Sequence, residues 1–124
     1  MSDLPPDRLS RLPQRWLLLA AVGLPSLLWM IQLCDALYDC GCHALWNGAA
    51  SACNVHAEHP PHCPWCATGL WGSVLPPLTV LGAQATLLFS VKSKLWAAAL
   101  AASAFPLVGS ALGLLFGWAT GYWT

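Results

Sequence analysis

Three long segments of this chain contain no Asp, Glu, Lys, Arg or His, and this pattern limits the folds open to it. They are residues 16–33, 67–91 and 95–123. A helix that crosses a bilayer needs about 20 mostly apolar residues, so the first segment is near the minimum and the other two are ample. Charged residues make up 8% of the chain, against about 25% in soluble proteins. The sequence therefore predicts an all-α membrane protein with three transmembrane helices in the lipid bilayer.

The basic residues predict how these helices are oriented. Three arginines precede the first apolar segment, and Lys92 and Lys94 lie between the second and the third. Residues 34–66 contain no Lys or Arg. Because Lys and Arg favour cytoplasmic loops, we expect a cytoplasmic amino terminus and an extracytoplasmic segment at 34–66, which is periplasmic in a bacterium. A formal net charge of zero, with no basic patch, argues against nucleic acid as a partner.

Apolar runs and charges together divide the chain into six regions. These are a cytoplasmic tail at 1–15, the first helix at 16–33, the extracytoplasmic loop at 34–66, the second helix at 67–91, a cytoplasmic turn at 92–94 and the third helix at 95–124. The first helix can continue to Tyr38 before Gly41 interrupts it. Its apolar run exceeds a signal-peptide core of about 7 to 15 residues, and no small-x-small cleavage site follows it. We therefore expect it to be retained as a membrane anchor.

All six cysteines and all four histidines lie between Cys34 and Cys66. Thiolate sulfur and imidazole nitrogen are ligands for soft and borderline metal ions. Two short pairs, Cys53-x-x-His56 and Cys63-x-x-Cys66, can each hold an ion from a single turn. The sequence therefore predicts a transition-metal site with Cys53, His56, Cys63 and Cys66 as ligands, and it favours zinc over copper.

The earlier donors of the loop are Cys34, Cys40, Cys42 and His43, which we expect to form a second site or disulfides. A disulfide scaffold is an alternative for the whole loop, because thiols outside the cytoplasm tend to oxidise. Each bridge would contribute about 2 to 4 kcal/mol to a segment with little apolar mass of its own. This alternative leaves the histidines unexplained, so metal binding is the preferred interpretation.

A further alternative is redox catalysis at Cys63-Pro-Trp-Cys66. Pro64 suits the first turn of a helix, so we expect Cys63 to cap that helix, whose dipole favours a reactive thiolate. A CxxC pair at the extracytoplasmic end of a transmembrane helix resembles the membrane thiol oxidoreductases of the DsbB and vitamin K epoxide reductase families. That resemblance implies electron transfer to a quinone, with shuttle thiols among the three earlier cysteines. Those families use at least four helices, whereas this chain offers three.

A c-type haem is excluded, because Ala67 follows Cys66 where the attachment motif requires histidine. Transport by this chain alone is disfavoured, since the predicted spans contain no ionisable residue to mark a pathway. Trp46, Trp65 and Trp71 are near enough to the loop in sequence to cover it.

The third helix contains a row of glycines spaced four residues apart, at Gly109, Gly113, Gly117 and Gly121. Such a row forms a groove in which another helix can approach closely. That helix belongs either to this chain or to another membrane subunit. Together these features predict a non-catalytic accessory subunit of a larger membrane complex, with other subunits docked on the glycine face and a metal bound in the extracytoplasmic loop.

Overall fold

A computed structural model describes residues 6–124, and within that range every regular element is a helix. The long helices are α1 (Pro6–Tyr38), α3 (Leu70–Ser90) and α4 (Lys94–Thr120). The short elements are two 3₁₀ helices, η1 (Leu45–Asn47) and η2 (Asn54–His56), and the one-turn helix α2 (Pro64–Ala67). All three long helices are long and apolar enough to cross a membrane. The predicted all-α class with three candidate membrane helices is therefore confirmed. Residues 1–5 of the predicted tail lie outside the described residues.

Helix α1 is longer than a bilayer is thick. Its 33 residues extend about 50 Å, against a hydrocarbon core of about 30 Å. The part apolar enough to span runs from Leu12 to Tyr38. The helix ends at Tyr38 because Asp39 adopts a left-handed backbone conformation with φ of 49°. Cys34, which the sequence placed in the loop, is therefore carried by the last turns of α1.

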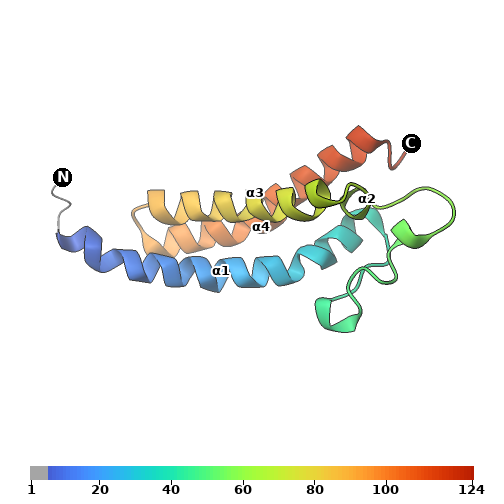
Figure 1. The fold of residues 1–124 in the computed structure, drawn as a ribbon. Helices are drawn as coiled ribbons and strands as arrows, with labels where there is room; N and C mark the ends of the chain where they lie inside the picture. The colour runs from blue at the N-terminus through green and yellow to red at the C-terminus, as the bar shows by residue number, and fades with distance from the viewer. Residues whose placement is uncertain (1–5) are drawn as a thin grey trace.

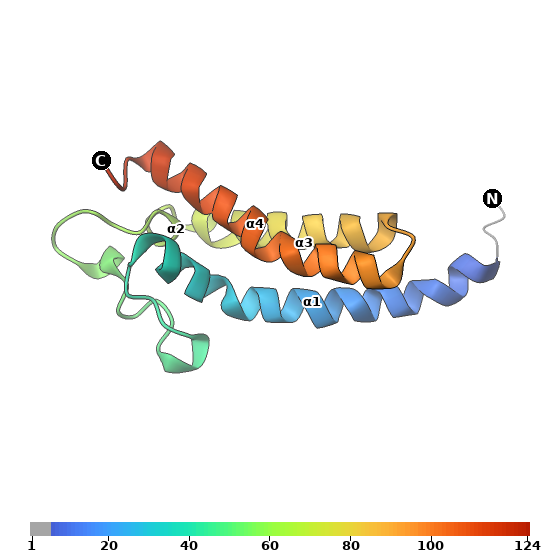
Figure 2. The same cartoon turned by 180° about the vertical axis from the view of Figure 1, so that it is seen from behind.

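The three long helices lie side by side, and the cysteine-rich segment covers one end of them (Figure 1 and Figure 2). The turn between α3 and α4 lies at the other end, beside α1, whose first turns extend beyond it. There Arg15 donates hydrogen bonds to the carbonyl oxygens of Val91 at 2.8 Å and Lys92 at 3.0 Å, and Lys94 donates one to Gln14. These basic residues therefore lie at the end of the bundle away from the cysteines.

A buried glutamine joins the three long helices. Gln84 of α3 is fully buried, and its Nε2 donates to Ser26 Oγ of α1 at 2.8 Å and to the Ala101 carbonyl oxygen of α4 at 3.2 Å. Hydrogen bonds between membrane helices contribute about 0.6 kcal/mol each on average. Because water is absent from the bilayer core, they also determine which helix faces meet.

The glycine row of α4 is covered by this chain itself. A Cβ at Gly109 would lie 2.5 Å from Leu33 of α1. One at Gly113 would collide with Leu37 of α1, and one at Gly117 with the ring of Trp123. Gly109 and Gly113 therefore pack against α1 of the same chain. Docking of other subunits on this glycine row stays a prediction.

The second helix begins differently from the prediction. Cys63 caps a helix whose first residue is Pro64, as the sequence predicts, but this helix, α2, ends after one turn. Gly69, with φ of 64°, separates it from α3. A Cβ at Gly72 of α3 would collide with the carbonyl group of Trp65, so glycine lets α2 pack tightly against α3. The CPWC motif is thus a separate turn folded back on the bundle.

Candidate metal centre

The six cysteines come from four parts of the chain that meet at one end of the bundle. The contributing positions are Cys34 in α1, Cys40 and Cys42 in the segment after it, Cys53 before η2, Cys63 at the cap of α2 and Cys66 within α2. All six are unbridged thiols. Five have 3% or less of their surface exposed, and Cys66 is half-buried. The residues most able to bind a soft metal are therefore also the centre of the loop's core.

The sulfur atoms form one continuous cluster. Cys34 Sγ lies 3.1 Å from Cys63 Sγ and 3.6 Å from Cys40 Sγ. Cys40 Sγ in turn lies 3.4 Å from Cys42 Sγ. Cys53 Sγ lies 3.4 Å from that of Cys66, and both are within 4.8 Å of Cys63 Sγ. The cysteines that the sequence divided between two sites are therefore brought together in one.

A sharp reversal after α1 returns the chain towards Cys34. Asp39 and Gly41 both adopt left-handed conformations, with φ of 49° and 87°. The Asp35 carboxylate accepts a hydrogen bond of 2.8 Å from the Gly41 N–H and so closes the turn. Only glycine fits at position 41, because a Cβ there would lie 2.6 Å from the carbonyl oxygen of Ala52 and the backbone conformation disfavours other residues.

Asn54 connects the two halves of the loop to each other and to the carboxyl-terminal segment. Its backbone N–H donates to the Cys40 carbonyl oxygen at 2.7 Å, and its Oδ1 accepts from the Cys63 N–H at 2.6 Å. Its Nδ2 donates to the Tyr122 hydroxyl at 2.8 Å, and that hydroxyl donates to the Tyr38 carbonyl oxygen at 2.5 Å. The sequence did not single out Asn54 or Tyr122. The one local signal is that Asn54 directly follows a cysteine.

Aromatic rings pack in the same core as the cysteines. Tyr38 is at the centre, with ring centroids 5.7 Å from Trp65, 5.1 Å from Tyr122 and 5.6 Å from Trp123. Tyr38 and Trp65 are themselves buried, with 3% and 6% of their surface exposed. Aromatic pairs at these distances add about 0.5 to 1.5 kcal/mol each.

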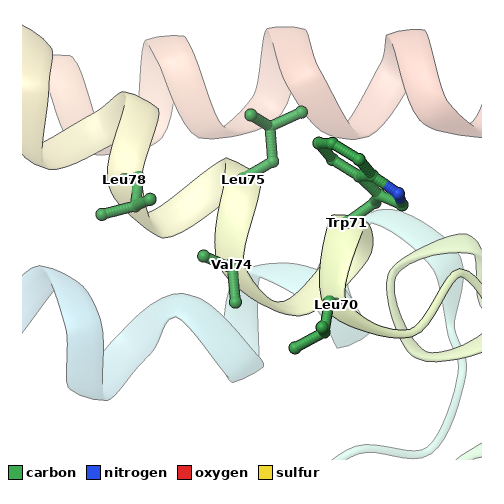
Figure 3. A pocket seen from close by; sticks show the side chains of 5 residues that line it. All are labelled: Leu70, Trp71, Val74, Leu75 and Leu78. Carbon is green, nitrogen blue, oxygen red and sulfur yellow. The ribbon is translucent and has the colours of Figure 1, made fainter.

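Of the three tryptophans expected to cover the loop, Trp65 does so and two do not. Trp46 and Trp71 are exposed. Trp71 lies beside Leu70, Val74, Leu75 and Leu78 around an apolar surface pocket of α3 (Figure 3). An indole ring in this position suits the interface between lipid and water.

No histidine in the described residues belongs to the cysteine groups. His43, His56 and His59 are exposed, and His62 is half-buried. The His56 ring nitrogen Nε2 lies 3.1 Å from the Ala50 carbonyl oxygen, and His62 Nδ1 lies 2.9 Å from that of Asn54. Of the predicted ligand set, the structure brings together Cys53, Cys63 and Cys66, with His56 outside. The resulting ligand set is sulfur alone.

Burial and hydrogen bonding act on these thiols in opposite directions. Burial is the main cause that raises the pKa values of Cys42 and Cys53, because it disfavours the charged thiolate. The Cys34 and Cys63 thiols instead stabilise the Cys66 thiolate by hydrogen bonding and lower its pKa to about 4. No lysine or arginine occurs between Cys34 and Cys66 to balance negative charge. A metal ion would supply that balance.

A cavity of about 480 Å³ lies beside the cluster. Its lining includes Met30, Cys34, Trp65, Cys66 and His56. Two of the six cysteines, Cys34 and Cys66, are thus among the residues of its mostly apolar lining. Its soft donors, a methionine thioether and two cysteine thiols, suit a soft metal ion.

The fold and the site define a class: an all-helical protein with three candidate membrane helices and a cysteine cluster able to hold a metal ion. Comparison with protein-family models, with curated proteins and with solved structures finds no match to this chain.

Proposed function

We propose that this chain is an integral membrane protein that binds a transition metal through its cysteine cluster. One observation carries the proposal: six thiols from four separate parts of the chain converge, five of them buried. Thiolates are ligands for soft and borderline metal ions such as copper(I) and zinc. As reduced thiols without an ion, this much sulfur at the centre of a small loop would provide only weak S–H hydrogen bonds.

Metal binding also explains how the loop is stabilised. The segment between α1 and α2 contains two short 3₁₀ turns and exposes Leu45 and Trp46, so its apolar core is small. A structural zinc ion contributes about 10 to 16 kcal/mol of apparent binding free energy to small metal-dependent domains. An ion held by residues as distant in sequence as Cys34 and Cys66 would tie the whole loop to the helices.

The proposed location of the metal is the extracytoplasmic side. This proposal is supported by the charges: Arg15, Lys92 and Lys94 lie at the opposite end of the bundle from the cysteines, and basic residues favour the cytoplasm. Reporter fusions test it. Alkaline phosphatase fused after Thr124 is expected to be active and green fluorescent protein fused after Ser93 to fluoresce. The reverse pattern would place the cluster in the cytoplasm.

Metal content and thiol state test the central proposal. The full chain, purified without oxygen in mild detergent, is expected to contain bound metal and six reduced cysteines. A Cys53→Ser variant should lose metal, whereas the matched variant His43→Ala, at an exposed residue, should retain it. Protein that carries no metal after expression with zinc or copper, and takes up none as the reduced apoprotein, would overturn the proposal.

A redox function is the second candidate, because the sulfur atoms also form three separate close pairs. Cys34 lies 3.1 Å from Cys63, Cys40 lies 3.4 Å from Cys42, and Cys53 lies 3.4 Å from Cys66. Oxidation of one pair would form an S–S bond and release two electrons and two protons. A quinone in the adjacent cavity would accept both and become a quinol.

This function can use pairs other than Cys63 with Cys66. Cys34 in α1 lies beside Cys63, and Cys53 before η2 lies beside Cys66, so each cysteine of the CPWC turn has a second thiol partner. Reduced protein mixed with a short-chain ubiquinone without oxygen should then bleach the quinone absorbance, one quinone for each disulfide formed. An unchanged absorbance would remove the redox candidate.

A role as a subunit of a larger complex is a further proposal. Its support is the exposed apolar side chains of the long helices, among them Leu107 and Trp118. The glycine row of α4 adds no support, because Leu33, Leu37 and Trp123 lie against it. Metal binding is therefore the centre of the proposal.

A further inference from the structure

The six sulfur atoms of the cysteine cluster form groups of three whose atoms all lie within 4.8 Å of one another, and four of these groups together contain twelve different close pairs. These four groups are Cys34, Cys40 and Cys63; Cys34, Cys42 and Cys66; Cys40, Cys42 and Cys53; and Cys53, Cys63 and Cys66. Every cysteine belongs to two of these groups, and any two groups share a single cysteine. If each group is placed at one corner of a tetrahedron, each cysteine joins two corners and therefore corresponds to one of the six edges.

This arrangement matches one kind of metal site. An ion at the centre of each group would be bound by three sulfur atoms, and every thiolate would bridge two ions. Three-coordinate binding by bridging thiolates suits copper(I), a soft ion without a strong demand for four ligands. We propose that the cluster holds four copper(I) ions, each bound by three cysteines. This proposal rests on the metal-binding function proposed above.

The distances allow such a cluster with a small expansion. With metal–sulfur bonds of about 2.3 Å, three sulfur atoms in a plane around one ion lie about 4 Å apart. The sulfur distances in the structure are 3.1 Å for Cys34–Cys63, 3.4 Å for Cys40–Cys42 and 3.6 Å for Cys34–Cys40. The side chains therefore have to separate by less than about 1 Å, a shift within reach of small side-chain rotations.

A single zinc ion fits the arrangement less well. Zinc in structural sites takes four ligands in a tetrahedron. Four thiolates would satisfy it, and the other two cysteines would remain buried thiols without a role. The histidines do not supply a mixed site instead, because His56 contacts the Ala50 carbonyl oxygen and lies outside every group.

Two zinc ions that share a pair of bridging thiolates also fit less well. In that geometry the end sulfurs of one ion lie about 5 Å or more from those of the other, so each end sulfur has three close sulfur neighbours. In the structure every cysteine sulfur lies within 4.8 Å of four of the other five. The pairs that share no group are Cys34 with Cys53, Cys40 with Cys66 and Cys42 with Cys63. This is the pattern of an octahedron of sulfur, whose alternate faces would hold the four ions.

The charge and the surroundings are compatible with this cluster. Binding of four copper(I) ions displaces six thiol protons, so six thiolate charges meet four positive charges and the cluster retains two negative charges. No electron transfer is involved when copper is supplied as copper(I). The thioether of Met30 lines the cavity beside Cys34 and Cys66 and provides a soft ligand on the path of an entering ion.

Stoichiometry and copper spectroscopy test the inference. Apoprotein prepared from the full chain in detergent, reduced and without oxygen, is titrated with copper(I) acetonitrile complex and, separately, with zinc. We expect uptake of about four copper ions per chain, no paramagnetic copper signal, and X-ray absorption showing three sulfur neighbours at about 2.3 Å per copper. Saturation at one or two copper ions would overturn the four-ion cluster while leaving the metal-binding function in place. No binding of either metal would overturn both.

Six single Cys→Ser variants give a second, independent test. In the four-ion cluster every cysteine bridges two ions, so each variant should lose about half or more of the copper. In a mononuclear site two of the six substitutions should leave the metal content unchanged. His59→Ala and His43→Ala, at exposed residues, are the matched controls and should keep full loading. The helical circular dichroism of each variant establishes that the helices have formed, and two or more silent cysteines would contradict the proposal.

Discussion

Cys34 Sγ in α1 and Cys63 Sγ at the cap of α2 lie 3.1 Å apart, so the end of α1 and the start of α2 are in contact through these two sulfur atoms. Both residues are buried. The intervening loop is thus closed at its base, and the other four cysteines lie around the same point. An ion bound there would hold the loop closed, which makes the order of the loop depend on the metal.

Metal removal is therefore expected to loosen the loop before it affects the helices. Metal-loaded protein treated with a strong copper(I) or zinc chelator should become cleavable by proteases between residues 43 and 62. The helical circular dichroism should stay unchanged, because contacts without any cysteine, such as those of Gln84, also join α1, α3 and α4. Mass spectrometry of the fragments locates the cleavage sites. Cleavage that is equal with and without metal would show that the loop is ordered by its own contacts.

Asn54→Ala should weaken metal retention without removing a ligand. The substitution deletes the hydrogen bonds from the Asn54 side chain to Tyr122 and from the Cys63 N–H to that side chain, at a cost of about 1 to 3 kcal/mol. Competition with a chelator should then show an equilibrium constant for metal loss that is about 5- to 150-fold larger than in the unaltered protein. Asn47→Ala, at an exposed residue of η1, is the matched control. Equal retention in both variants would show that Asn54 does not hold the site together.

The helical framework was predictable from the sequence, because membrane helices are determined by long runs without charge. The end of α1 near Tyr38 and the cap at Cys63 followed from local rules, since Gly41 interrupts a helix and Pro64 starts one. The break at Gly69 was missed, because a glycine inside an apolar run is common in membrane helices.

The union of six cysteines in one cluster could not be predicted, because it depends on how the loop is folded in three dimensions. The reversal at Asp39 and Gly41 returns Cys40 towards Cys34, and no spacing rule reports that path. His56 was chosen as a ligand for its position three residues after Cys53. The short helix η2 contains His56, whose ring nitrogen contacts the Ala50 carbonyl oxygen instead.

Gly113→Val should destabilise the contact between α1 and α4. A Cβ at Gly113 collides with Leu37 and would lie 3.4 Å from the Trp65 ring, so we expect a loss of about 1 to 3 kcal/mol from overpacking. Gly82→Val is a matched control, because it makes the same change within a helix where no atom lies within 4 Å of the added Cβ. Thermal unfolding in detergent measures both. A lower midpoint in both variants alike would assign the effect to helix propensity instead of packing.

Cys66 is expected to react with alkylating reagents at a rate nearly independent of pH. Because neighbouring thiols lower its pKa to about 4, it remains a thiolate in the metal-free protein from pH 6 to 9. An ordinary cysteine, with a pKa of about 8.5, gains about a hundredfold in thiolate between pH 6 and 8.5. Alkylation by iodoacetamide, followed for each cysteine by mass spectrometry, should therefore give a flat profile for Cys66 and almost no reaction for buried Cys42, whose pKa is raised.

Two substitutions of Cys63 test whether its hydrogen bond to Cys66, and not the exposure of Cys66, causes the flat pH profile. Serine keeps a donor of similar size, so the pKa of Cys66 should remain low, whereas Cys63→Ala removes the donor and should raise it. Under the alanine substitution the alkylation rate of Cys66 should begin to rise with pH. A low pKa also makes a thiolate a weaker nucleophile, so the flat profile should have a modest plateau. A rate that rises about tenfold per pH unit up to pH 8 in the unaltered protein would show that Cys66 is an ordinary thiol.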